Sequence, residues 1–239
     1  VNNIEFDHGD IFEDIKAIQK QFHCFIRTVP GEGLIVANNE SYNVKTLLEM
    51  GAWSPIETFG HQAARWQVDC LKEDGSHFSI LDDGIKVAEV DWDLLGMHNV
   101  NNGLAAIAAA NHAGVKPDVA GQALSAFESV KRRLEIKGEV NNVTVYDDFA
   151  HHPTEIKTTL HGLRKKVGNA CIIAVIEFVS SSMRQGLHNA DLVEAFSEAD
   201  RVFCRQPDWD LSGLFESKGR ADVVICQDVS GLVAGDYTV

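Results

Sequence analysis

Residues 143–156, which read VTVYDDFAHHPTEI, limit the possible folds of this chain more than any other stretch. A short apolar run ends in two acids, Asp147 and Asp148, a turn then carries His151 and His152, and a helical pattern begins after a proline. A strand, a polar turn and a helix in this order are typical of an α/β protein that binds a ligand at the carboxyl end of a strand. Two acids and two histidines are costly to place on one turn unless they bind something.

The rest of the second half supports this α/β interpretation. From residue 139 onward, short apolar runs alternate with amphipathic helical patterns, which predicts a doubly wound, mainly parallel sheet. We expect its strands at residues 143–146, 171–178, 201–204 and 223–226, with the start of another at Tyr237.

The first half has a different pattern, with helices and a buried strand followed by short strands whose turns, EDGS and DDG, favour hairpins. An Ala-rich helix opens on a cluster of Asn residues, and a second helix follows it. The expected helices are residues 10–29, 44–50, 96–115 and 118–130, and the expected strands are 33–39, 56–59, 65–71, 77–81 and 85–90. We place a domain boundary at Gly138, which gives domains of residues 1–137 and 138–239.

The composition excludes several functions. A formal charge of −14 argues against a nucleic-acid surface, and no apolar run reaches the length of a membrane span, so we expect neither partner. The five cysteines are widely spaced without a CxxC pair, which predicts reduced core thiols in a cytoplasmic protein. The chain opens without a starting Met and ends in what resembles half a strand, so we interpret it as a piece of a longer protein.

Two polar clusters of the first half are candidate sites. Asp7 and His8 follow a short apolar stretch and suit a hard cation or its bound water, although a solvated strand end has the same composition. His98, Asn99 and Asn102 stand at the start of the Ala-rich helix. Helix capping explains one such Asn, whereas an amide that both donates and accepts also suits an adenine edge.

Two further clusters lie near and beyond the proposed boundary. The pair before Leu134, Arg132 and Arg133, suits a phosphate, although a helix end explains cations equally well. On the turn described first, an acid suits a ribose hydroxyl and a histidine can reach a transferring group, while buried histidines with satisfied hydrogen bonds are the alternative. Neither G-x-x-x-x-G-K-[ST] nor G-x-G-x-x-G occurs in the chain.

In this order and spacing the four clusters resemble the Mur ligase family, the ATP-dependent amide-bond ligases of peptidoglycan synthesis. NIEFDH is similar to N-x-E-x-D-H, GMHNVNNGLAAIAAA to G-x-H-N-x-x-N-x-x-A-A, RRLE to R-R-F-E, and DDFAHHPTEI to D-D-Y-A-H-H-P-T-E-I. Segments such as EFDHGDIFEDIKAIQKQFH resemble the branch that joins UDP-N-acetylmuramate to the murein tripeptide L-alanyl-γ-D-glutamyl-meso-diaminopimelate in peptidoglycan recycling. The resemblance implies part of a central ATP-binding domain followed by a Rossmann-like, mainly parallel C-terminal domain.

The resemblance also implies roles for these residues. ATP would convert the sugar carboxylate into an acyl phosphate, which the amine of the tripeptide then attacks. On this basis Mg²⁺ would be held by His8, the adenine end of the nucleotide by His98, Asn99 and Asn102, the phosphates by Arg133 and the ribose by one of Asp147 and Asp148, with His151 near the reacting centre.

Two departures from the family pattern matter. The amino-terminal UDP-binding domain and the phosphate loop are absent, so we expect this chain alone to be inactive. The family pattern E-x-R-S-x-T-M is matched by EFVSSSM, which places Val179 at the arginine and Ser180 at the serine. We expect Ser180 and, in place of the missing arginine, Arg184 to contact the peptide. Another Mur or folylpolyglutamate-type ligase and a non-catalytic nucleotide-binding module remain alternatives.

Overall fold

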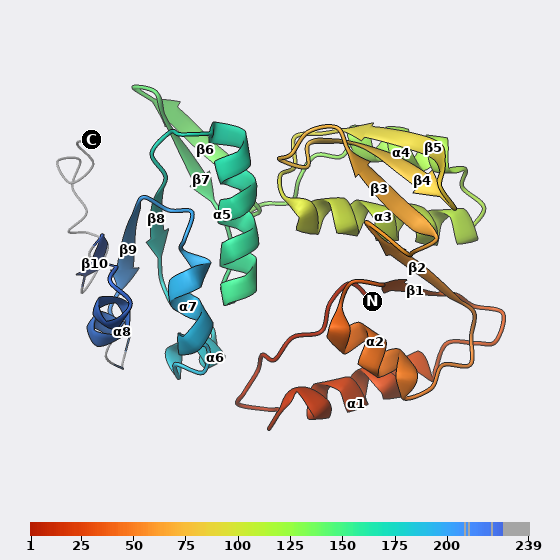
Figure 1. The fold of residues 1–239 in the computed structure, drawn as a ribbon, viewed down its shortest axis with the longest axis horizontal. Coiled ribbons are helices and arrows are strands. Elements are labelled where there is room, and N and C mark those ends of the chain that lie inside the picture. Colours follow the sequence, from red (N-terminus) through yellow and green to blue (C-terminus); the bar gives the residue numbers. More distant parts are fainter. Residues whose placement is uncertain (208, 210, 221, 227–239) are drawn as a thin grey trace.

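The computed structural model of this chain describes residues 1–207, 209, 211–220 and 222–226. Figure 1 shows three groups of elements: a five-stranded sheet with two helices, a helix pair near the N-terminus, and a second α/β unit formed by the later part of the chain. The strand start expected at Tyr237 lies outside the described residues. No helix within the described ranges combines the length and the apolar character needed to cross a membrane.

The first half contains four helices and five strands. They are α1 (Ile15–Ile26), β1 (Ile35–Asn38), α2 (Tyr42–Glu49), β2 (Ile56–Gly60), β3 (Trp66–Cys70), β4 (His77–Asp82), β5 (Ile85–Asp91), α3 (Met97–His112) and α4 (Pro117–Ser125). Local chemistry sets several of these limits, since Asp14 and Ser41 cap α1 and α2 with their side chains and a proline starts α4. The helix expected at 118–130 ends early, at Ser125.

The five strands pair in the order β1 to β5, and the sheet is mixed. Strands β3, β4 and β5 form the predicted antiparallel meander, with Asp83 and Gly84 in the left-handed conformation at one turn. Strand β2 differs from the expectation because it runs parallel to both of its neighbours, β1 and β3. The chain therefore returns through the loop after β2 and starts β3 in the same direction as β2. The short apolar runs alone do not reveal the relative direction of the two strands.

Helix α3 covers one face of this sheet and fixes the position of its own first turn. Val100, Leu104 and Ile107 are fully buried against Trp66 and Phe78 of the sheet. The apolar spacing along α3 therefore becomes the core, and the polar first turn is held at the edge of that core.

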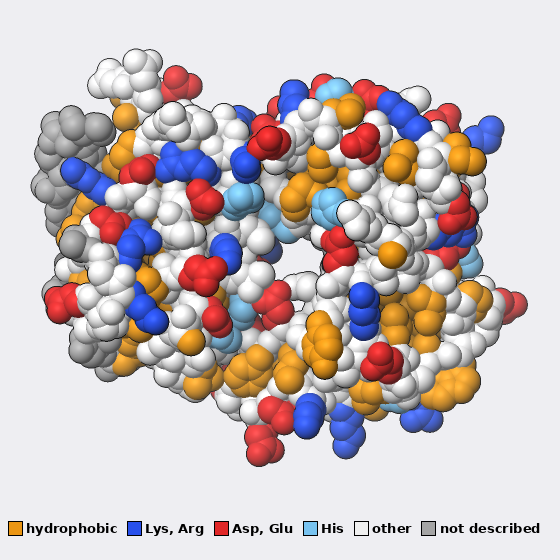
Figure 2. Space-filling model, in the orientation of Figure 1, with side chains coloured by type: hydrophobic (Ala, Val, Ile, Leu, Met, Phe, Trp, Pro, Cys, Tyr) orange, Lys and Arg blue, Asp and Glu red, His pale blue; other side chains and the backbone are white. Residues whose placement is uncertain are grey.

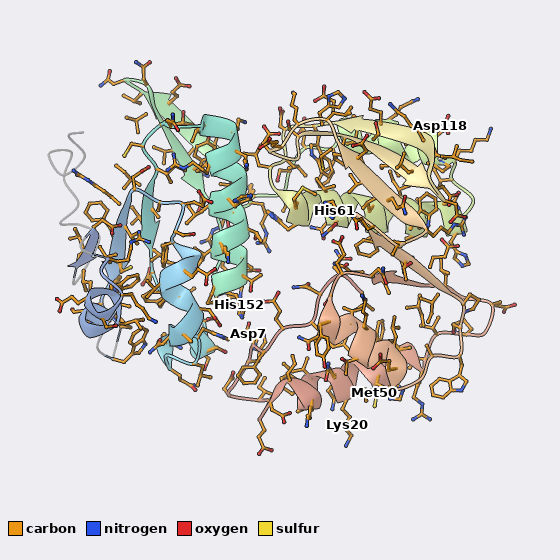
Figure 3. The ribbon with its side chains drawn as sticks, viewed as in Figure 1. Asp7, Lys20, Met50, His61, Asp118 and His152 are labelled. Atoms are coloured by element: carbon orange, nitrogen blue, oxygen red, sulfur yellow. The ribbon has the colours of Figure 1, made fainter. Side chains whose placement is uncertain are left out.

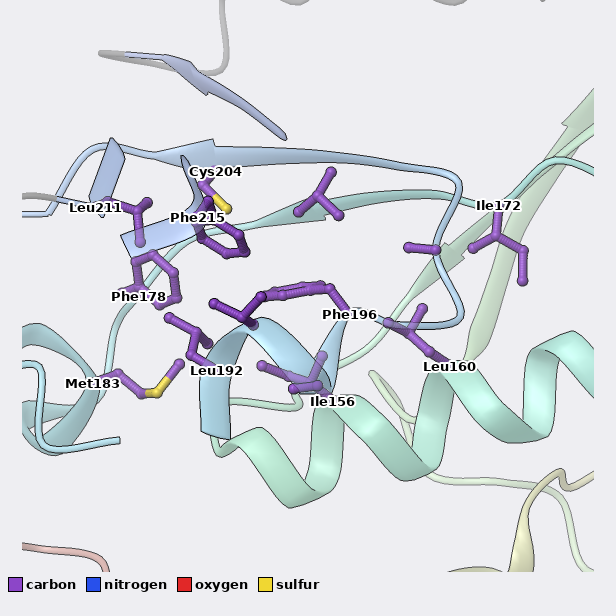
Figure 4. Packing of buried hydrophobic residues seen from close by; sticks show 14 of the residues in the cluster. Ile156, Leu160, Ile172, Phe178, Met183, Leu192, Phe196, Cys204, Leu211 and Phe215 are labelled. Carbon is purple, nitrogen blue, oxygen red and sulfur yellow. The ribbon is translucent and has the colours of Figure 1, made fainter. Parts of the chain in front are cut away.

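The second half comprises β6 (Glu135–Val140), β7 (Val143–Asp147), α5 (Pro153–Val167), β8 (Ile173–Ile176), α6 (Ser181–Arg184), α7 (Asn189–Ala195), β9 (Arg201–Arg205), α8 (Leu211–Ser217) and β10 (Val223–Cys226). The predicted parallel sheet is confirmed for β8, β9 and β10. Figure 4 shows Ile156 and Leu160 of α5 packed with Leu192 and Phe196, so the apolar stripe of α5 faces this core.

One expected strand of the second half belongs to a different sheet. The strand at 143–147, β7, is absent from the parallel sheet and pairs antiparallel with β6, which the sequence did not indicate. Asn141 and Asn142 both adopt the left-handed conformation in the hairpin turn between them. Gly138 lies inside β6, and the boundary placed there stays a prediction.

The expectation that all cysteines lie in the core was wrong. Only Cys204 is buried, and Cys171 is exposed.

Candidate functional site

A cleft of about 1070 Å³ lies between the N-terminal segment, the start of α3 and the start of α5. Figure 2 shows the molecule hollowed at its centre, with histidine and acidic side chains on the rim. The cleft is lined by eight of the residues singled out from the sequence, namely Asp7, His8, His98, Asn99, Asn102, Arg133, His151 and His152. It is not lined by Arg132, Asp147, Asp148, Ser180 or Arg184.

The first turn of α3 forms one wall, and its polar side chains do not cap the helix. Gly96 is the N-cap residue, with φ of 85°, and no side chain makes a capping hydrogen bond. The amide nitrogen of Asn99 donates to the Leu95 carbonyl at 2.8 Å, which leaves the Asn99 amide oxygen without a partner in the described residues. The capping alternative therefore does not explain these Asn residues.

Two polar atoms of this wall, Nδ1 of His98 and Oδ1 of Asn101, are buried and find no hydrogen-bond partner among the residues that the structure describes. Such atoms are uncommon in folded proteins and are expected where a ligand or water supplies the partner. Burial lowers the pKa of His98, and the nearby Arg133 lowers it further. Asn102 accepts a hydrogen bond from Asn2 of the N-terminal segment. We define residues 96–102 as the α3 wall.

The N-terminal segment enters the site beside β1. The backbone N–H of Asn38 donates to the Val1 carbonyl at 3.0 Å, so the segment runs along β1 before it reaches Asp7 and His8. His8 has φ of 54°, a conformation that is uncommon for a residue with a side chain and often marks functional positions. Figure 3 shows Asp7 on this segment where it meets the start of α5, marked by His152.

The carboxylate of Asp7 is held between the two halves of the chain. Its Oδ1 accepts a hydrogen bond from the Ser182 hydroxyl at 2.7 Å, while Oδ2 lies 3.9 Å from Nε2 of His8 and 4.0 Å from Nε2 of His151. Burial tends to raise the pKa of Asp7, but the Ser182 hydrogen bond and the neighbouring His8 outweigh it and lower that pKa. Asp7 is therefore a carboxylate facing two imidazoles.

The two histidines of the opening turn do different things. Nδ1 of His151 lies 3.0 Å from the Phe149 carbonyl, which can only accept, so Nδ1 carries a proton and Nε2 faces Asp7. His152 instead joins the halves, with Nε2 3.3 Å from the Phe6 carbonyl and Nδ1 3.3 Å from Glu5. Both histidines line the cleft, but the alternative of a histidine with satisfied hydrogen bonds describes His152 alone, because both of its ring nitrogens have partners.

The acids of this turn are also distinct. Both oxygens of Asp148 accept backbone hydrogen bonds, from Leu134 at 2.8 Å and Ala150 at 2.7 Å, so this side chain shapes the turn. Asp147 makes only a loose ion pair, 3.6 Å from Nε of Arg132. Arg133 points to the cleft, 3.9 Å from Glu155. We define residues 147–155 as the turn wall.

The two predicted peptide-contacting residues lie apart from the cleft. Ser180 caps α6 by accepting from the Met183 amide at 3.3 Å, and its hydroxyl is 3.4 Å from the His151 carbonyl. Arg184 is exposed at the end of α6. Sequence reasoning assigned no role to Ser182, Glu5 or Glu155. Ser182 stands at the threonine of the E-x-R-S-x-T-M pattern, and the two glutamates also stand inside quoted motifs, so all three could have been found there.

Helix α5 connects these walls. Its first residues carry the turn wall, and Gly162 in its middle lies against the backbone of Gly96, so close that a Cβ on Gly162 would be 2.9 Å from the Gly96 Cα atom. Lys165 further along α5 forms an ion pair at 2.7 Å with Glu73 before β4. The helix thus touches the N-terminal segment, the α3 wall and the first sheet.

A metal would find few protein ligands here. Within the described residues no three His, Cys, Asp or Glu side chains converge closely enough to hold an ion. Asp7 and His8 are two adjacent donors, and Mg²⁺ typically takes one or two carboxylates and completes its shell with water and phosphate. This donor set fits an ion of that kind.

Two family models match the chain: the Mur ligase middle domain matches residues 1–110, and the Mur ligase glutamate ligase domain matches residues 132–235. The chain is 53% identical over 208 residues to the UDP-N-acetylmuramate–L-alanyl-γ-D-glutamyl-meso-2,6-diaminoheptandioate ligase of Escherichia coli, covering 87% of this chain and 45% of that protein. It is 35% identical over 206 residues to the UDP-N-acetylmuramate–L-alanine ligase of Desulforapulum autotrophicum, covering 85% and 45%. The chain spans about half the length of the curated relatives it matches.

Solved structures of Mur ligases also match this chain. A murein peptide ligase from Psychrobacter arcticus matches with a TM-score of 0.67 and 36% identity over 97% of this chain and 50% of that one. The UDP-N-acetylmuramate–alanine ligase of Thermotoga maritima matches with a TM-score of 0.74, and at 21% identity it supports the fold alone.

Proposed function

Because this chain belongs to the Mur ligase family, we propose that it supplies the ATP site and C-terminal domain of a ligase that joins L-alanyl-γ-D-glutamyl-meso-diaminopimelate to UDP-N-acetylmuramate. One observation carries the proposal: residues from separate segments of the chain line one cleft. The choice of substrate rests on the relatives, since identity is 53% and 48% to two ligases named for this tripeptide and 35% to one named for L-alanine.

The α3 wall is proposed to bind the adenine of ATP. The free amide oxygen of Asn99 suits the exocyclic amine of adenine, and the amide nitrogen of Asn102 can donate to a ring nitrogen. The unpaired polar atoms of His98 and Asn101 support a polar ligand at this wall. Arg133, which has only a distant ion pair, would meet the phosphates.

The ribose is assigned to Asp147 in preference to Asp148. Sequence reasoning left this choice open, and Asp148 already accepts two backbone hydrogen bonds. Asp147 lies outside the lining of the cleft, so binding the ribose would require it to leave its loose pair with Arg132.

His8 and Asp7 are proposed to hold Mg²⁺, which when bound would neutralise charge on the phosphates. His151 presents Nε2 toward the same region. Its proposed role is to stabilise negative charge on the reacting groups or to accept a proton from them. The protein's own contribution is then positioning and electrostatic stabilisation. Reduced thiols, which the free cysteines of the described chain allow, agree with a cytoplasmic reaction.

The deciding experiment measures phosphate release from ATP by the complete reading frame that contains this chain. We expect release that requires both UDP-N-acetylmuramate and the tripeptide and that is poor with L-alanine. Release with L-alanine instead would assign the protein to the branch named for that amino acid. ATP binding without release would favour the non-catalytic nucleotide-binding module.

A variant tests the adenine assignment. Asn99→Ala should weaken ATP binding by about tenfold or more, as expected for the loss of 1 to 3 kcal/mol of base recognition. Asn111→Ala, at the far end of the same helix, is the matched control and should bind ATP like the wild type. Equal binding by both variants would remove Asn99 from the nucleotide site.

A further inference from the structure

Ser182 joins two parts of the chain that are distant in sequence. Its side chain is completely buried, its hydroxyl donates to Oδ1 of Asp7 at 2.7 Å, and its oxygen accepts a hydrogen bond from the Gly9 amide at 3.3 Å. One hydroxyl therefore fixes both the side chain and the backbone of the turn that carries His8. Ser182 stands at the threonine of the E-x-R-S-x-T-M pattern, and neither that pattern nor a family model assigns it a role.

The two segments fit closely around this contact. A Cβ on Gly9 would lie 2.4 Å from Cδ1 of Leu187, so the N-terminal turn packs directly against the loop after α6. A buried polar contact supported by such packing defines one position for the turn.

Fixing one oxygen of Asp7 also determines the direction of the other. With Oδ1 bound to Ser182, Oδ2 points between the imidazoles of His8 and His151, 3.9 and 4.0 Å from their Nε2 atoms. Both histidines line the cleft. Without the Ser182 hydroxyl, the Asp7 carboxylate could rotate away, and its negative charge would no longer face both rings.

We propose that Ser182 is a positioning residue that docks the Asp7–Gly9 turn onto α6 and directs the free oxygen of Asp7 toward His8 and His151. Its effect on catalysis rests on the proposed ligase function, whereas the contact itself does not. Ser182 would act through Asp7 and without touching a substrate.

The contact can be measured on this chain without any activity, by hydrogen exchange at the Gly9 amide. Ser182→Ala should speed this exchange by about tenfold or more, and Ser182→Thr, which keeps the hydroxyl, should restore the protection. Ser181→Ala is the matched control, because the Ser181 hydroxyl accepts a hydrogen bond from Gln185, directly after α6, and no described residue of the Asp7–Gly9 turn bonds to it. Unchanged Gly9 exchange in Ser182→Ala would overturn the proposal.

The consequence for catalysis is measured in the complete reading frame. Ser182→Ala should lower kcat by about tenfold or more with little change in the KM for ATP, Ser182→Thr should recover most of kcat, and Ser181→Ala should match the wild type. Wild-type kcat in Ser182→Ala would overturn the positioning role. An inactive wild type would instead reject the proposed function, and Gly9 exchange would still decide whether the contact exists.

A second variant covers the possibility that changes at the buried Ser182 disturb folding. Asp7→Asn keeps an oxygen that can accept from Ser182 but removes the charge. It should retain the protection of Gly9 and yet lower kcat to the level of Ser182→Ala. Full activity in Asp7→Asn would show that the direction of the charge is irrelevant, which contradicts the proposal.

Discussion

The α3 wall and the turn wall face the same cleft, yet they are stabilised in opposite ways. The α3 wall stands on a helix whose apolar side is fully buried, and it leaves the His98 and Asn101 polar atoms unpaired. The turn wall has an exposed Phe149 and is held by hydrogen bonds to Asp148, Glu5 and Glu155. A wall supported by a core can keep polar atoms free for a ligand, whereas a wall made of a loop must use its own polar groups to keep its shape.

The largest expected effect concerns the support of the α3 wall. Leu104→Ala should lower the free energy of unfolding by about 3 to 5 kcal/mol, because it removes a fully buried side chain and leaves a cavity beneath the wall. Chemical denaturation measures this change. Val119→Ala, at a half-exposed position on α4, should cost much less. A cost for Leu104→Ala below about 1 kcal/mol would show that the core does not hold this wall.

The next effect concerns the turn wall. Asp148→Ala should cost about 2 kcal/mol of stability, since it leaves the Leu134 and Ala150 amides without their charged acceptor. Asp147→Ala is the control and should cost less than about 0.5 kcal/mol, because its exposed ion pair with Arg132 is loose. If denaturation gives equal costs for the two variants, hydrogen bonding to Asp148 is not what holds the turn.

A smaller effect of opposite sign is expected on the α3 wall. Asn101→Ala should raise the free energy of unfolding by about 0.5 to 1 kcal/mol in the absence of nucleotide, because it removes a buried oxygen without a partner and favours the helix. Asn111→Ala on the same helix measures the helix preference alone. Only a gain for Asn101→Ala beyond that of Asn111→Ala counts as relief of the unpaired oxygen, and a loss would contradict it.

The smallest expected effect is a change in how steeply the free energy of unfolding depends on pH. Burial holds the pKa of His98 below its ordinary value of 6.5. Above that value both folded and unfolded chains have a neutral His98, so it contributes no pH dependence there. As the pH falls through 6.5, the unfolded chain takes up a proton that the folded chain resists, so stability declines until the lower, folded pKa is reached.

His98→Gln should therefore flatten the decline in unfolding free energy between about pH 7 and pH 5. His112→Gln, at the other end of α3, serves as the control and should keep the wild-type slope. The lowered pKa of Asp7 affects stability only at more acidic pH, below the ordinary value of 3.8, so it does not obscure this window. A steeper slope in His98→Gln would reverse the sign assigned to His98.

The elements predicted correctly are those whose regularly spaced apolar residues form the core. Helices α3 and α5 are examples, since the core includes Leu104 and Ile107 of α3 and Leu160 of α5. Strand β6 was missed because its residues are mostly polar and its pairing depends on left-handed Asn141 and Asn142. That turn conformation follows from the hairpin as a whole and carries little signal in the apolar pattern.

The site shows the same division. The family resemblance implied that His8, Asn99 and His151 belong to one site, and all three line one cleft. The distinct behaviour of His151 and His152, or of Asp147 and Asp148, could not be predicted, because adjacent residues of one type differ only in which backbone groups the fold brings to them. The contact made by Ser182 could not be predicted either, since its partner Asp7 is 175 residues away.

The approach of Gly162 to Gly96 has a consequence for how the two walls respond to ligands. The backbones of the two glycines are in direct contact, with no side chain between them to absorb a displacement. The first residues of α5 also form part of the turn wall. A ligand that draws the first turn of α3 toward α5 therefore also moves the turn wall, and a ligand on the turn wall pushes back on α3. By thermodynamic linkage the two affinities must change by the same factor, so a ligand on the α3 wall and a ligand on the turn wall would each report on the other.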